Sequence, residues 1–436
     1  MYCLLCMDRE TSFFDTSSQR CSKCSETVLP LIVLAFIVMM LGIGGCALRA
    51  RFRKTKGRWY LLWQRISFRT KLRVAISFVQ VATQLERVYD LRYPEAFSKL
   101  LDYLSIINLD VTGWLQLYPT CIGLGQLEAR LYFFAFVPLG VVCTVAPLAA
   151  KLCNRPLLSA LPFVLGWTFL LFPVITSFAF RSLAQCECFD YVGDGKVCFL
   201  REDYEVICTG SLFGYTAAPP PVLAAAWTCV GVWAIGVPLT YALLIKLLDR
   251  GLGRAALGIL LDDYRPQVRG WELVIVGEKL LLTGFLALFP GSWLQLFFGT
   301  VVTLFAFVLQ SRMNPYQTAT DNLLAYVTAL SLLAVFLGSL GIQTNALGIE
   351  INLTALVALL FIFTLLVLVA TLLFFIVEIR TAPKVLRLKA TGNLPSLTLA
   401  PGKKWHLFIS HNCTPLVCMK PLSRVTTSSD YLPKLN

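Results

Sequence analysis

The chain has 436 residues, of which 57% are hydrophobic and only 14% are charged, and its mean hydropathy is +0.70. An ordinary soluble protein carries roughly 25% charged residues. The composition therefore excludes a typical soluble enzyme and indicates a chain that is solvated mostly by lipid. The formal net charge of +13 would suit nucleic-acid binding, but the placement of the charges points elsewhere.

Nine apolar stretches predict an all-α polytopic membrane protein with a small Cys-rich module at its N-terminus. A transmembrane helix needs about 20 mostly apolar residues to cross roughly 30 Å of hydrocarbon. The expected spans are 28–48, 72–88, 128–150, 156–183, 221–248, 271–289, 293–311, 322–342 and 353–377. We expect the second to cross the membrane, although it is the weakest because it contains polar residues, namely Arg73, Gln80, Thr83, Gln84 and Glu86.

The basic loops set the expected orientation. Segment 49–73 follows the first span and holds ten Lys and Arg but no acidic residue. The positive-inside rule places such a loop in the cytoplasm, so the N-terminus lies outside and, after nine spans, the C-terminus lies in the cytosol. Counted as far as Lys404, the inner side then holds 24 Lys and Arg and the outer side nine. We expect a plasma-membrane protein whose positive charge meets the anionic inner leaflet rather than nucleic acid.

The same pattern divides the chain into five segments. Residues 1–27 form an extracellular Cys-rich fragment, 28–48 the first transmembrane helix and 49–71 a basic cytoplasmic linker. Residues 72–380 form a multi-helix membrane domain, and 381–436 form a cytoplasmic tail. The tail is rich in Pro, Ser and Thr, which disfavours a packed domain there.

Two groups of cysteines fall on the predicted outer side. They are Cys3, Cys6, Cys21 and Cys24 in the first group and Cys186, Cys188, Cys198 and Cys208 in the second. The exterior is oxidising, so we expect disulfides in both. For the first group, a zinc site is the alternative, because paired Cys-x-x-Cys motifs also bind zinc, and a cytosolic N-terminus would favour it. Gly-Asp-Gly at 193–195 predicts a turn between Cys188 and Cys198, and hence a disulfide-pinned hairpin.

Two further features lie on the predicted outer side. Asn352 begins an Asn-Leu-Thr glycosylation pattern, although it abuts the membrane, where the glycosylating enzyme has poor access. Segment 94–109 has apolar residues at helical spacing, which predicts an amphipathic helix that packs over the outer mouth of the bundle. These apolar residues are Phe97, Leu100, Leu101, Leu104 and Ile107.

The sixth expected span contains the ionisable residues Glu272, Glu278 and Lys279. Such side chains are costly inside a membrane and usually face a cavity, an ion path or one another. Glu278 and Lys279 are adjacent, so they point about 100° apart and cannot pair as helix neighbours. One hypothesis is a cation site or gate. The alternative is a structural ion pair with Arg130 or with a polar residue of the second span.

Gln80 and Gln84 of the second span are candidates to line the same polar interior or to make structural interhelical hydrogen bonds. The chain has two histidines, His406 and His411, and both lie near the C-terminus. The spans contain no Ser-His-Asp set and no Gly-rich phosphate loop. We therefore expect neither enzymatic activity nor a cofactor or metal in the membrane part.

Several short motifs together resemble one group of proteins. They are KLRVAISFVQV at 71–81, INLD at 107–110, DYRP at 263–266, WEL at 271–273, KLLLTG at 279–284, RMNPY at 312–316 and DN at 321–322. With the Cys-rich start and the basic exit of the first span, the set resembles multi-pass membrane proteins of protists. These carry a membrane domain like that of TRP (transient receptor potential) proteins, preceded by ephrin-receptor-like Cys-rich repeats.

The segment KKWHLFISH at 403–411 resembles the first strand of a Toll/interleukin-1-receptor-like (TIR-like) domain, which follows the spans in some of these proteins. After His411 the chain reads NCTP and departs from that pattern. The remaining 25 residues are too few for a five-stranded sheet. The resemblance therefore implies a truncated domain without NAD-cleaving activity. The alternative is a basic tail with a chance match.

The TRP-like resemblance implies, by distant analogy, a channel or a channel-like sensor that passes cations. We expect a homo-oligomer. A non-conducting receptor or adhesion protein with an extracellular ligand is the rival prediction, and a lipid or small-solute carrier is a third. A re-entrant pore loop would favour a channel. The loop Pro-Gly-Ser at 290–292 is too short to form one.

Overall fold

The computed structural model describes residues 12–15, 20–23, 68–89, 91, 93–105, 125–152, 156–191, 195–212, 214–248, 257–289, 293–346 and 352–381. All of them belong to one structural unit, Met1–Ala382. The expected first span at 28–48, the basic linker and the tail with its TIR-like segment lie outside the described residues.

Within these ranges, six helices are long and apolar enough to cross a membrane. They are α7 (Leu127–Leu152), α8 (Leu161–Ala184), α9 (Pro220–Val230) continued through a π-helical turn (Gly231–Gly236) into α10 (Val237–Leu248), α14 (Trp293–Met313), α15 (Ala319–Ala346) and α16 (Leu353–Thr381). A helix rises 1.5 Å per residue, so each is long enough for roughly 30 Å of hydrocarbon. The structure confirms the helical membrane fold, while the count of nine spans stays a prediction.

Two expected spans are shorter helices with interruptions. The stretch 72–88 forms α3 (Phe68–Ala82) and α4 (Leu85–Tyr89). The stretch 271–289 forms α13 (Trp271–Thr283), and a 3-10 turn (Phe285–Leu288) follows it. The prediction of one continuous helix in each stretch was therefore wrong.

Gly284 marks the break after α13. A Cβ atom at this position would lie 2.8 Å from the Leu280 carbonyl oxygen and 2.8 Å from a ring carbon of Phe180. Only glycine lets the chain approach α8 this closely, because even a methyl group would overlap both neighbours. Close packing against α8, rather than hydrophobic length, therefore decides where α13 ends.

The amphipathic segment forms α5 (Glu95–Ser105). Its apolar residues Phe97, Leu101 and Leu104 are buried, and the Phe97 ring packs edge-on against Phe361 of α16 with 5.4 Å between the ring centroids. The helix thus covers part of the bundle, as its spacing predicts.

A small disulfide-bonded sheet follows α8. Strands β3 (Cys186–Tyr191), β4 (Gly195–Leu200) and β5 (Asp203–Ile207) are antiparallel in the order β3-β4-β5. Disulfides join Cys188 to Cys198, directly across β3 and β4, and Cys186 to Cys208. The predicted pinned hairpin is confirmed. A second short pair follows, formed by β6 (Gly210–Leu212) and β7 (Tyr215–Ala217).

Near the N-terminus, β1 (Ser12–Asp15) pairs with β2 (Arg20–Lys23). Cys21 lies in β2, opposite Phe14. The thiol states of Cys3, Cys6, Cys21 and Cys24 lie outside what the structure describes, so their disulfides remain a prediction.

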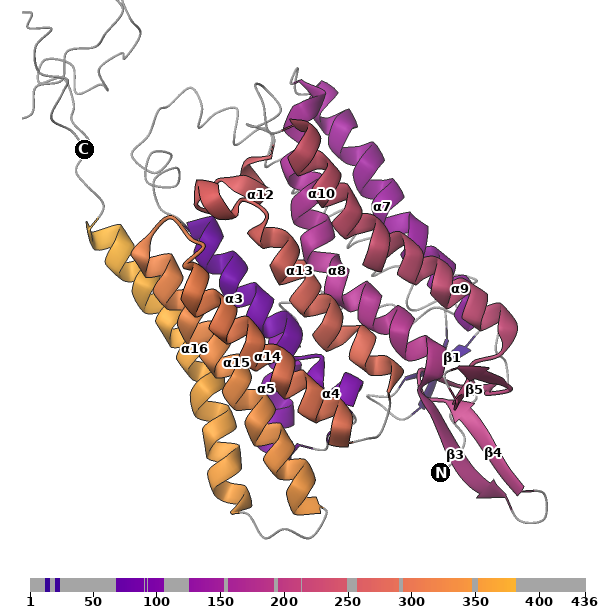
Figure 1. The fold of residues 1–436 in the computed structure, drawn as a ribbon. Helices are drawn as coiled ribbons and strands as arrows, with labels where there is room; N and C mark the ends of the chain where they lie inside the picture. Colours follow the sequence, from indigo (N-terminus) through magenta and orange to yellow (C-terminus); the bar gives the residue numbers. More distant parts are fainter. Residues whose placement is uncertain are drawn as a thin grey trace, which may run out of the picture. The chain divides into compact units, whose positions relative to one another are not determined.

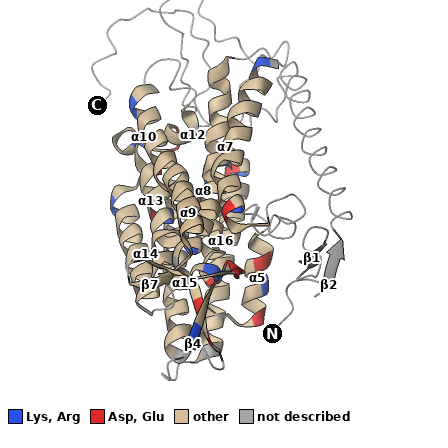
Figure 2. Ribbon diagram, turned by 90° about the vertical axis from the view of Figure 1, so that its right-hand side faces the viewer, with Lys and Arg blue, Asp and Glu red and all other residues tan. Residues whose placement is uncertain are grey.

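The long helices form two groups that share α13 (Figure 1). Helices α7, α8 and α9 pack on one another, and α14, α15, α16 and α3 form the second group, while α13 contacts α8 and α10 on one side and α14 and α3 on the other. Helix α3 begins and α16 ends at the same end of the bundle as the short helix α12 (Gly258–Leu261), and we call this the α12 end of the bundle. Strands β3 and β4 lie at the opposite, strand end. Figure 2 shows that Lys, Arg, Asp and Glu occupy only scattered positions on this mostly uncharged bundle.

Candidate functional site: buried charges around helix α3

Helix α3 carries cations on two of its faces. Lys71 and Arg73 are two residues apart, so their side chains point about 200° apart around the helix axis. Lys71 is buried, and its Nζ lies 2.6 Å from Asp321 Oδ1 and 2.6 Å from Glu378 Oε2. This ion triad fastens the beginnings of α3 and α15 to the last turn of α16.

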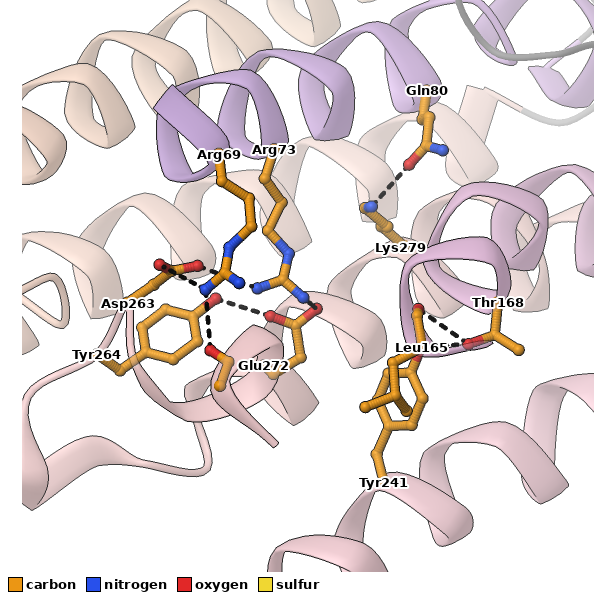
Figure 3. Close-up of polar contacts among 11 residues, drawn as sticks. Arg69, Arg73, Gln80, Leu165, Thr168, Tyr241, Asp263, Tyr264, Glu272 and Lys279 are labelled. Atoms are coloured by element: carbon orange, nitrogen blue, oxygen red, sulfur yellow. Dashed lines mark hydrogen bonds and ion pairs between the residues drawn. The ribbon is translucent and has the colours of Figure 1, made fainter. Parts of the chain in front are cut away.

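The other face presents Arg73 to α13 and to the loop before it (Figure 3). One Arg73 nitrogen lies 3.1 Å from Glu272 Oε1, and another lies 3.4 Å from Asp263 Oδ2. The Tyr264 hydroxyl donates to Glu272 Oε2 at 2.7 Å. Glu272 has no exposed surface, so water does not solvate its carboxylate, and Arg73 and Tyr264 stabilise it instead. Asp263 is held in addition by the Thr70 hydroxyl at 2.8 Å.

Two loops meet beside this cluster. Tyr264 forms an isolated β-bridge with Tyr316, and the Arg265 amide donates to the Pro315 carbonyl at 2.8 Å. The Asn322 side chain holds the backbone of Tyr316 at both its amide, 3.0 Å, and its carbonyl, 2.8 Å. Burial, and after it the Glu272 carboxylate, raise the pKa of the Tyr264 phenol. The phenol therefore stays protonated and acts as a hydrogen-bond donor.

Deeper in the bundle, Lys279 of α13 is held by neutral groups. It lies eight residues beyond Trp271, or about 12 Å by helical rise. Its Nζ donates to Gln80 Oε1 at 2.7 Å (Figure 3). The same nitrogen lies 3.9 Å from the centroid of the Phe169 ring. Gln80 in turn donates to the Leu170 carbonyl at 2.9 Å. Among the described residues, no carboxylate comes within ion-pair distance of Lys279.

Glu278 points elsewhere. It is half-buried and lies on the outer stripe of α13 with two exposed apolar residues, Val274 and Leu281. Its carboxylate forms no hydrogen bond or ion pair with any residue that the structure describes. The three ionisable residues of α13 therefore have three different environments.

The structure places Arg130 and Gln84 away from these residues. Arg130, in the first turn of α7, pairs with Asp203 of β5 at the strand end. The Ser177 hydroxyl of α8 donates to Gln84 Oε1 at 3.3 Å. Arg130 therefore pairs with the sheet and not with the sixth span. Two residues of the sixth span instead pair with the second span: Glu272 with Arg73 and Lys279 with Gln80.

Asn352 is exposed and caps α16, because its Oδ1 accepts the Ala355 amide at 3.2 Å. A glycan on the amide nitrogen would leave this acceptor in place. Glycosylation at this position remains a prediction.

Sequence reasoning missed the carboxylates that complete the cluster. Asp263 lies in a loop, while Asp321 and Glu378 lie near the ends of long helices, where charged residues are ordinary. Their presence in the DYRP and DN motifs was the available signal for Asp263 and Asp321. In the described ranges, no group of three or more His, Cys, Asp or Glu side chains could hold a metal ion.

The chain matches no family model, no curated protein and no solved structure. The TRP-like, ephrin-receptor-like and TIR-like resemblances therefore stay predictions.

Proposed function

We propose that the chain is a channel-like sensor of the plasma membrane that passes cations, with its N-terminus outside and its C-terminus in the cytosol. Ionisable residues inside a membrane bundle are costly, and they commonly mark ion paths or moving parts. Four cations of the described bundle, Lys71, Arg73, Arg181 and Lys279, are buried. The combination of a multi-span fold with buried charges supports a membrane protein that does more than anchor a domain.

The observation that carries the proposal is the position of the Arg73 cluster. It joins α3 to α13, and α13 is the helix that both groups of long helices contact. If α13 moves with α8 and α10, a change in the angle between the groups strains or breaks the ion pair of Arg73 with Glu272. An ion pair that is either made or broken gives two discrete arrangements, which a gate requires.

Current recordings from the purified full chain in planar bilayers test the proposal. We expect cation currents from the wild type and a changed open probability in Arg73→Gln, because the amide keeps a donor but removes the charge. Lys99→Gln is the matched control, since Lys99 forms an exposed ion pair with Glu95 on α5. Folded wild-type protein that passes no current would refute conduction.

A non-conducting receptor is the second candidate, and the disulfide-bonded sheet favours it. The edge strand β5 exposes Tyr204, Glu205 and Ile207, and two disulfides hold the sheet in one conformation. A rigid, exposed edge strand suits the binding of an extracellular ligand. Electrically silent bilayers that contain folded protein would favour this function over the channel, and a homo-oligomer fits either one.

A further inference from the structure

Helices α10, α13 and α14 show a shared lateral face that is almost wholly apolar. α13 lies between the other two and contacts both. The exposed residues of this face are Ile235, Leu239 and Leu243 before and within α10, Val274, Leu281 and Phe285 on and after α13, and Phe297, Val301 and Phe305 on α14. A face of this composition matches the hydrocarbon of a bilayer.

Glu278 is the one charged residue that the described part of this face carries between its helix ends. The fully buried carboxylates among the described residues, Glu272 and Asp321, are held by cations, Arg73 and Lys71 respectively. Glu278 has no such partner among the described residues. The feature is therefore specific to this position rather than general to the acidic residues of the chain.

The adjacent Lys279 does not neutralise Glu278 by contact. Neighbouring residues of a helix point about 100° apart, and the Lys279 amine is directed inward, to Gln80 and the Phe169 ring. The two opposite charges therefore lie on different sides of α13, one toward the bundle interior and one toward its outer face.

The other ionisable groups on the helices that contact α13 either bind residues other than Glu278 or lie near a helix end. They are Arg69, Lys71 and Arg73 on α3, Arg181 on α8, Tyr241 and Lys246 on α10, and Arg312 on α14. None of them forms a hydrogen bond or ion pair with the Glu278 carboxylate in the described structure. Arg181, for example, pairs with Glu202 at 2.7 Å.

An unpaired carboxylate against hydrocarbon is unfavourable when ionised, and binding a proton removes its charge without any rearrangement of the helices. We propose that Glu278 is a proton-binding site on the lateral face of the bundle, protonated when that face meets lipid and able to exchange its proton. The ligand is the proton itself. The assignment does not require the protein to conduct, so it stands or falls separately from the proposed function.

A hydrophobic carbodiimide, dicyclohexylcarbodiimide, tests this assignment on the full chain in liposomes. A protonated carboxyl gives its proton to a carbodiimide nitrogen, and its oxygen adds to the central carbon. The resulting O-acylisourea rearranges to a stable N-acylurea, so the whole reagent stays attached. Peptide mass spectrometry then locates the label.

We expect Glu278 to be labelled several-fold faster in acidic than in alkaline buffer, and Glu272 to stay unlabelled because it is fully buried and paired with Arg73. A water-soluble carbodiimide should leave Glu278 unmodified. Glu278→Asp should keep the label and Glu278→Gln should lose it. Gln removes an unpaired acid, so folding should not suffer, and intact-mass and size-exclusion measurements check this.

Four results would overturn the assignment. Equal labelling by the water-soluble reagent would place Glu278 in an aqueous groove. Protection by sodium or potassium at constant pH would make the ligand a metal cation. Labelling in detergent that disappears in liposomes would show that a second copy covers the residue. No label at Glu278 at any pH, while other carboxyls react, would show that it is ionised and partnered.

Discussion

Removing the Arg73 guanidinium should destabilise the protein far more than removing Arg73 and Glu272 together. Arg73→Met leaves the Glu272 carboxylate fully buried with one hydrogen bond, from Tyr264. Asp263 is affected less, because it keeps the Thr70 hydroxyl and the Arg69 guanidinium at 3.4 Å. The main cost is therefore the charge left on Glu272.

Breaking a buried ion pair from one side costs about 3–5 kcal/mol. Replacing both partners by apolar side chains of similar size is often close to neutral, within about 1–2 kcal/mol once the freed Tyr264 hydroxyl is included. The double variant Arg73→Met with Glu272→Met should therefore recover most of the loss. A coupling of at least about 2 kcal/mol between the two sites follows.

Thermal unfolding of the purified variants in one detergent measures this coupling as differences in apparent melting temperature. The exposed pair of Lys99 with Glu95 provides the matched cycle, and it should show almost no coupling because solvent screens both charges. Melting temperatures that fall additively in the Arg73 and Glu272 cycle would refute the reasoning. They would mean that the two charges are not interdependent in the folded protein.

Two further predictions concern packing and orientation. Gly299→Ala should lower the melting temperature by the equivalent of about 1–3 kcal/mol, because its Cβ would lie 2.5 Å from the Phe336 ring. Gly277→Ala is the control and should be neutral or stabilising, because a Cβ there has no atom within 4 Å. Equal effects of the two substitutions would contradict the packing. An impermeant thiol reagent added outside cells should label Lys196→Cys and spare Lys246→Cys. Both positions are exposed, and they lie at opposite ends of the bundle. Labelling of Lys246→Cys alone would show that the orientation is the reverse of the one proposed.

The hydrophobic pattern predicted the long helices well because a lipid-facing helix must be apolar over its whole length. Expected spans such as 293–311 differ from the observed helix by two residues at one end. The pattern was least informative at α3 and α13, where polar side chains such as Arg73 and Lys279 are buried against protein rather than facing lipid. There, packing against α8 and local hydrogen bonds decide where the helix stops, and neither is visible in hydropathy.

The sequence alone determined the membrane class and the hairpin pinned by Cys188 and Cys198, because hydropathy and turn residues act locally. It also picked out Glu272, Glu278 and Lys279 as costly residues, but it could not say what each one meets. Only the tertiary structure assigned Arg73 to Glu272 and Gln80 to Lys279 and left Glu278 on the outer face. The reason is geometric: these partners are about 200 residues apart in sequence, and which side of α13 a residue faces depends on how neighbouring helices pack.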